Sequence, residues 1–103
     1  MLHNKLTAQA EELAAMSKPK VLIVDDEHAI RRFLRTSLGA HGYDVHEAAT
    51  GEDAILQAVN VQPDLIILDL GLPDISGIEV TRRIREWAKA PIVILSVKDQ
   101  DTD

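Results

Sequence analysis

Cysteine is absent from the 103-residue sequence, which excludes disulfide bonds, thiolate metal sites and a cysteine nucleophile. No apolar run approaches the roughly 20 residues of a membrane-spanning helix, and residues 1–17 lack the apolar stretch of a signal peptide. Basic residues are few, since 11 Lys and Arg stand against 17 Asp and Glu; the net charge of −6 disfavours binding to nucleic acid or an anionic membrane. The five glycines form neither a dinucleotide-binding nor a P-loop pattern. We therefore expect a cytoplasmic protein that has no membrane partner.

The remaining composition, 46% hydrophobic and 27% charged, is that of a globular domain. Residues 2–16 are rich in Ala, Glu, Gln and Leu and predict a helix, which the residues before Pro19 should end. We divide the chain into a helical appendage and linker over residues 1–19 and a single domain over residues 20–103.

Strand and helix patterns alternate along this domain. Apolar runs at 21–24, 65–68 and 92–95 predict strands buried on both faces, and residues 43–47 predict a shorter alternating strand. The segments between them carry apolar residues at helical spacing. Strands that alternate with amphipathic helices predict an α/β fold with a doubly wound parallel sheet.

Several side chains in these elements carry more specific predictions. Gly42 should end the first helix of the domain in a left-handed conformation, and Ser76 and Glu79 should form a reciprocal capping box. Phe33 and Trp87 are expected in the core. The arginines are expected on solvated helix faces: Arg31, Arg32, Arg35, Arg82, Arg83 and Arg85.

Polar residues follow three of the predicted strands at the point where each strand ends. Asp25 and Asp26 follow the first strand, Asp69 the third and Ser96 the fourth. Parallel strands bring such residues to the same edge of the sheet, where ligands bind in open α/β folds. Clustered carboxylates without His or Cys favour Mg²⁺, and a carboxylate in such a site can become an aspartyl phosphate. Glu27, which also follows the first strand, is better explained as a turn or capping residue.

Three blocks of the sequence resemble the receiver domain of two-component response regulators. They are VLIVDDE at 21–27, PDLIILDLGLPDISG at 63–77 and PIVILS at 91–96. Further segments are similar to Kdp-type regulators, winged-helix transcription factors that control potassium-transport operons: IRRFLRTSL at 30–38, DLGLPD at 69–74 and RRIREW at 82–87. The resemblance implies a flavodoxin-like receiver fold with strand order 2-1-3-4.

The resemblance also assigns roles to individual residues. Asp69 would be the phosphoacceptor, and Asp25, Asp26, Asp69 and the backbone carbonyl of Gly71 would hold Mg²⁺. Ser96 would be the switch hydroxyl that contacts the phosphoryl group. Lys98 is either a charge partner of the site or a solvated loop residue.

The same resemblance implies partners outside this sequence. The phosphoryl donor would be the phosphohistidine of a sensor histidine kinase, and transcription would be controlled through a DNA-binding domain that the sequence does not include. Receivers continue with a fourth helix, a fifth strand that ends in a lysine, and a fifth helix, all of which would lie beyond Asp103. We therefore expect an open edge at the fourth strand, and we favour association of two copies through this edge. The alternative is that the helix over residues 2–16 packs where the fifth helix normally lies.

Two other functions compete with this interpretation. An aspartate-nucleophile phosphohydrolase also has an acid after a buried strand, but it needs a second Asp two residues later. Glu27 and Gly71 occupy those positions after Asp25 and Asp69. The second alternative is an interaction or inhibitory module that is not phosphorylated. We expect no enzymatic activity beyond slow loss of the phosphoryl group from Asp69.

Overall fold

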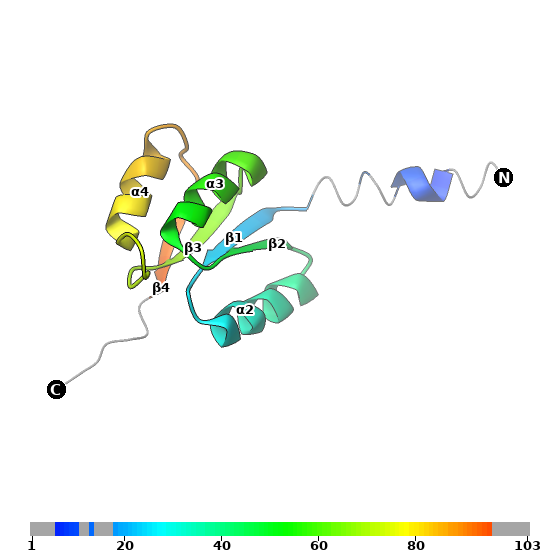
Figure 1. Ribbon diagram of the computed structural model, residues 1–103. Helices are drawn as coiled ribbons and strands as arrows, with labels where there is room; N and C mark the ends of the chain where they lie inside the picture. The colour runs from blue at the N-terminus through cyan, green and yellow to red at the C-terminus, as the bar shows by residue number, and fades with distance from the viewer. Residues whose placement is uncertain (1–5, 11–12, 14–17, 96–103) are drawn as a thin grey trace.

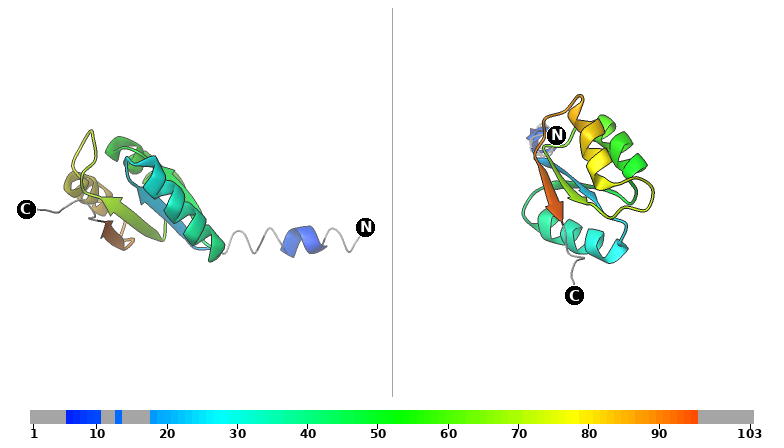
Figure 2. Two further views of the ribbon diagram at one scale, coloured as in Figure 1. Left: turned by 90° about the horizontal axis from the view of Figure 1, so that it is seen from below. Right: turned by 90° about the vertical axis from the view of Figure 1, so that its left-hand side faces the viewer.

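A computed structural model describes residues 6–10, 13 and 18–95. Strands and helices alternate along the domain: β1 (Lys20–Val24), α2 (His28–Ala40), β2 (Asp44–Ala48), α3 (Gly51–Val61), β3 (Leu65–Asp69), α4 (Gly77–Arg85) and β4 (Ile92–Leu95). The strands form one parallel sheet in the order β2-β1-β3-β4. Helix α2 covers one face of the sheet, and α3 and α4 cover the other (Figures 1 and 2). The predicted α/β fold and strand order are confirmed.

The core lies mainly between the sheet and the α3–α4 layer. Strand β1 is central, and its residues Val21–Val24 are completely buried because helices cover both of its faces. The buried core cluster consists of Leu22, Val24, Ala48, Ala54, Ala58, Ile66, Leu68, Val80 and Ile84. Burial of β1 and β3 side chains between the helix layers fixes the two strand ends that carry the predicted acids.

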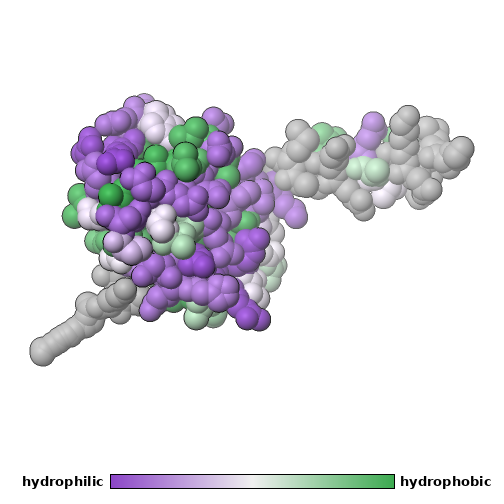
Figure 3. All heavy atoms as spheres, in the orientation of Figure 1, coloured by the Kyte–Doolittle hydropathy of each residue, from purple (hydrophilic) through white to green (hydrophobic). Residues whose placement is uncertain are grey.

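The prediction that β4 is buried on both faces is wrong. Val93 is 51% exposed and Ile94 is 43% exposed, because within residues 18–95 the strand pairs only with β3. Phe33 and Trp87 are not core residues either, since they are 70% and 46% exposed. Apolar side chains lie among hydrophilic ones on the face of the molecule that Figure 3 shows. Leu56 of α3 is one of the exposed apolar residues.

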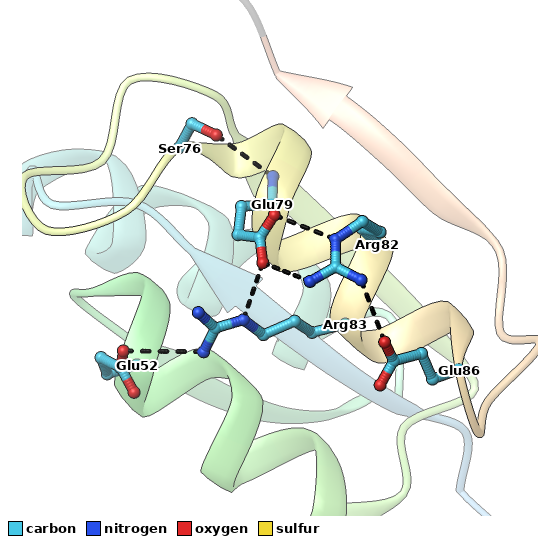
Figure 4. A network of polar contacts seen from close by, with 6 residues as sticks. All are labelled: Glu52, Ser76, Glu79, Arg82, Arg83 and Glu86. Atoms are coloured by element: carbon cyan, nitrogen blue, oxygen red, sulfur yellow. Dashed lines mark hydrogen bonds and ion pairs between the residues drawn. The ribbon is translucent and has the colours of Figure 1, made fainter.

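The helix ends follow the expected capping chemistry, with one difference. The Ser76 hydroxyl accepts a hydrogen bond from the Glu79 backbone N–H at 3.1 Å, which is half of the predicted capping box. The Glu79 carboxylate instead accepts hydrogen bonds from Arg82 and Arg83 (Figure 4), and these bonds lower the pKa of Glu79 to about 2. Arg83 also pairs with Glu52 of α3 at 3.8 Å, so the network joins the two helices.

Gly42 has a φ of +89° just after α2, as predicted for a residue that reverses the chain there. Near the N-terminus, residues 6–10 and Leu13 are helical, which confirms part of the predicted helix; its other residues lie outside the described ones. Leu6 and Leu13 are more than half exposed. None of the helices in the described segments is long and apolar enough to span a membrane.

Candidate metal and phosphoacceptor site

The sheet brings together three of the acids that the sequence places at strand ends. Asp25 directly follows β1 and Asp69 is the last residue of β3, and these strands are neighbours with Val24 opposite Leu68. One carboxylate oxygen each from Asp25, Asp26 and Asp69 lies within 4.8 Å of the others. The predicted convergence of these carboxylates is therefore present in the structure.

Asp25 is the most constrained member of this acidic cluster. Asp25 is 1% exposed and Asp69 is 3% exposed. The Glu27 backbone N–H donates to Asp25 Oδ1 at 2.8 Å, whereas Oδ2 is buried without a hydrogen-bond partner among the described residues. Burial raises the pKa of the Asp25 carboxyl, the Glu27 hydrogen bond lowers it, and the charges of Asp69, Asp26 and Glu27 raise it further. An ionised Asp25 therefore lacks compensation on one oxygen.

The chemistry of the cluster fits a hard divalent cation. All three side chains offer carboxylate oxygens, which suit Mg²⁺ better than a soft transition metal. Asp26 is exposed, so solvent reaches the cluster and water can complete a magnesium coordination shell. A cation bound there would also compensate the buried Asp25 oxygen.

The other predicted site residues have different outcomes. The Gly71 backbone N–H donates to Asp69 Oδ1 at 3.2 Å, which places Gly71 beside the cluster; the role of its carbonyl stays a prediction. Ser96 and Lys98 lie outside the described residues.

The sequence that contains the acidic cluster matches a known protein family. The response regulator receiver domain matches residues 21–103 of the chain. The chain belongs to this family. The predicted receiver family is therefore confirmed.

Curated relatives of this receiver domain are transcriptional regulators. The chain is 53% identical over 83 residues to the KDP operon transcriptional regulatory protein KdpE of Escherichia coli K12, a match that covers 81% of this chain and 37% of the relative. A KdpE from Mycobacterium tuberculosis is 47% identical with the same coverage. The chain thus spans little more than a third of these relatives.

Solved structures agree with the fold of the receiver domain. The chemotaxis protein CheY4 of Vibrio cholerae has a TM-score of 0.76 and 32% identity, over 82% of this chain and 72% of that one. The response regulator TrrA, solved in complex with the histidine kinase ThkA, gives 0.72 and 36% over 82% and 74% of the two chains.

Two residues that the sequence analysis missed hold the receiver's loop between β3 and α4. Asp74 reaches the start of α3, where its Oδ1 accepts from the Gly51 N–H at 2.8 Å and its Oδ2 from the Glu52 N–H at 2.9 Å. These bonds hold the pKa of Asp74 below its usual value. Gly77 begins α4 so close to the strand end that a Cβ would lie 2.7 Å from Leu70 Cα and 3.0 Å from the Asp69 carbonyl oxygen.

The sequence signals for these two residues were different in strength. Gly77 lies inside the receiver motif at 63–77, so its position could have been noted. Asp74 lies 23 residues from Gly51 along the chain, and no local pattern predicts that contact.

The role of Arg31 also differs from its prediction. The prediction that it lies on a solvated helix face is wrong, since its side chain is only 14% exposed. Its guanidinium bonds to Glu47 of β2 and to the backbone carbonyl of Asp25. Arg35, one helical turn later, is 54% exposed and fits the prediction better.

Proposed function

We propose that Asp69 of this receiver domain is a Mg²⁺-dependent phosphoacceptor. Asp25, Asp26, Asp69 and the carbonyl of Gly71 would hold the ion, Ser96 would contact the phosphoryl group, and Lys98 is the candidate charge partner. The observation that carries the proposal is the buried Asp25 Oδ2, which lacks a partner among the described residues beside two further carboxylates.

The reaction needs little more from the chain than a placed nucleophile. A carboxylate oxygen of Asp69 forms a bond to phosphorus while the bond from phosphorus to the donor's histidine nitrogen breaks, and that nitrogen keeps the electron pair. A Mg²⁺ ion held at this site would supply neutralisation of the charge on the transferred phosphoryl group. Asp25 and Asp26 would hold the cation, and the Gly71 N–H donates to the Asp69 carboxylate at 3.2 Å.

The relatives support the donor and the output of this proposal. TrrA is a response regulator in complex with a histidine kinase, and KdpE is a transcriptional regulatory protein. We propose by analogy that the protein is cytoplasmic, that a sensor histidine kinase phosphorylates the domain that starts near Lys20, and that a separate DNA-binding domain carries the output in control of potassium transport.

A phosphorylation assay tests the proposal. The chain is incubated with acetyl phosphate and Mg²⁺, and an adduct of about 80 Da, the mass of one phosphoryl group, is expected on Asp69 by peptide mapping. The adduct should disappear with EDTA and in Asp69→Asn. Asp64→Asn is the matched control. Asp64 precedes β3, at the other end of this strand from Asp69, and its carboxylate accepts a hydrogen bond from the Lys20 N–H.

The same assay separates the alternatives. Turnover of a generic phosphate ester would support the phosphohydrolase alternative. If the assay gave no adduct and no turnover, that result would support an interaction module that is not phosphorylated. Both results would contradict the proposed function.

We also propose that two copies associate at the β4 edge. Val93 and Ile94 of this strand are about half exposed, and an open strand edge offers unpaired backbone groups to a second chain. Light scattering at rising concentration should show a dimer that Ile94→Lys weakens, and a monomer at all concentrations would contradict association.

A further inference from the structure

The Arg31 guanidinium connects three segments of the receiver: α2, β2 and the residue that follows β1. The residue belongs to the first turn of α2, and its Nε donates to Glu47 Oε1 of β2 at 3.0 Å. Its Nη1 donates to the backbone carbonyl of Asp25, after β1, at 2.7 Å. A largely buried guanidinium is costly unless it is paired and hydrogen-bonded, and both conditions hold here.

These bonds complete the fixation of Asp25. The Asp25 backbone N–H donates to the Ala48 carbonyl at 3.1 Å, its own carbonyl accepts from Arg31, and its Oδ1 accepts from the Glu27 N–H. The backbone of Asp25 is thus held on both sides. Its Oδ2 is the oxygen left without a partner among the described residues.

We infer that Arg31 is the positioning residue of the cation site and that Glu47 orients it. The inference rests on the proposed function, because it concerns the cation that Asp25 would bind. Arg31 touches no side-chain oxygen of the acidic cluster in any contact given above; it acts through the Asp25 backbone. A cation site is sensitive to such support, because substitution of a residue that orients a metal ligand typically lowers metal affinity ten- to a hundredfold.

The effect is one of geometry more than of charge. Arg31 and Glu47 carry opposite charges 3.0 Å apart, so the pair as a unit changes the potential at the acidic cluster little. The guanidinium fork also matters, since it donates from Nε to Glu47 of β2 and from Nη1 to the backbone carbonyl of Asp25, which follows β1. A lysine ammonium is a point charge on a flexible stem and does not reproduce that fork.

The test compares variants that separate charge from position. The double variant Arg31→Gln with Glu47→Gln keeps the net charge of the pair and removes the fork. Its Kd for Mg²⁺, measured by calorimetry, is expected to rise about tenfold or more. In the metal-free proteins, hydrogen exchange of the Glu27 amide should become faster in the double variant than in the wild type, while the amides of β3 stay protected.

Two controls isolate this effect from a loss of stability. Arg35→Ala removes a residue that also pairs with Glu47, at 3.1 Å, but has no bond to Asp25 among those described; its Kd should match the wild type. Ile84→Val weakens the core near the opposite end of α4 and should lower stability without changing the Kd. Should the double variant not fold, Arg31→Lys tests the same fork and is expected to weaken binding as well.

The outcomes distinguish this inference from the proposed function. The inference alone is overturned if the wild type binds Mg²⁺ and the folded double variant, or Arg31→Lys, binds it with the same Kd. A wild-type chain that binds no Mg²⁺ overturns the proposed function and the inference with it.

Discussion

The acidic cluster should destabilise the metal-free protein, and Asp25→Asn should relieve that effect. Asparagine has nearly the same shape, and its carbonyl oxygen can still accept from the Glu27 N–H as Asp25 Oδ1 does. The substitution removes one of three charges whose nearest oxygens lie within 4.8 Å. We therefore expect the variant to be more stable than the wild type in EDTA at neutral pH.

The magnitude follows from the geometry. Two unit charges 4.8 Å apart repel by about 3.5 kcal/mol at an effective dielectric of 20. Each carboxylate spreads its charge over two oxygens and Asp26 is solvated, so a gain of about 1–2 kcal/mol in the free energy of unfolding is a reasonable expectation. The gain should fade at lower pH. Because the folded-state pKa of Asp25 is raised, the wild type recovers stability as the pH falls through that pKa.

Magnesium should reverse the order of stability. At about a hundred times its Kd, a ligand that binds only the native state stabilises it by about 2.7 kcal/mol, and Asp25→Asn should lose most of this term. Urea unfolding with EDTA and with Mg²⁺ measures both effects, and Asp26→Asn, at an exposed position, should show a smaller gain in EDTA. If Asp25→Asn were less stable than the wild type in EDTA, the reasoning on carboxylate repulsion would be refuted.

Three further predictions concern the scaffold of the site. Gly77→Ala should cost about 1–3 kcal/mol in urea unfolding and weaken Mg²⁺ binding, since its Cβ would meet backbone atoms of Leu70 and Asp69; wild-type values would contradict this. Asp74→Asn should lower stability between about pH 5 and 7, and the difference should shrink progressively as the pH falls below about 4, because the contribution of the Asp74 carboxylate is lost as the pH passes through its depressed pKa; a difference that does not change with pH would disagree. Ile84→Ala should cost about 2–5 kcal/mol in thermal or urea unfolding and leave the Kd for Mg²⁺ unchanged, because Ile84 is fully buried in the core; an altered Kd would show coupling that the structure does not indicate.

The order of elements and the acidic cluster could be predicted because both depend on local patterns. Apolar runs mark the strands, and the residues that follow a strand lie at the carboxyl edge of a parallel sheet whatever the details of packing. Asp25, Asp26 and Asp69 were therefore identified from their positions in the sequence, and the structure brings them together.

Contacts between distant elements could not be predicted in this way. Arg31 looks like any polar helix residue, and only the placement of β2 beside α2 brings Glu47 to it. Burial at the sheet edge also depends on residues far away in the sequence. The apolar run of β4 looks the same as that of a central strand, but β4 is the last strand of the described sheet, and Val93 is therefore half exposed.

The proposed phosphorylation depends on carboxylates from two strand ends that together hold one divalent cation beside Asp69. Anomalous diffraction from crystals soaked in Mn²⁺, a stand-in for Mg²⁺ with similar oxygen ligands, tests it most directly. One strong peak is expected within coordination distance of Asp25, Asp26 and Asp69, and it should be lost in Asp25→Asn crystals. A peak elsewhere with none at these carboxylates would show that they do not form the cation site.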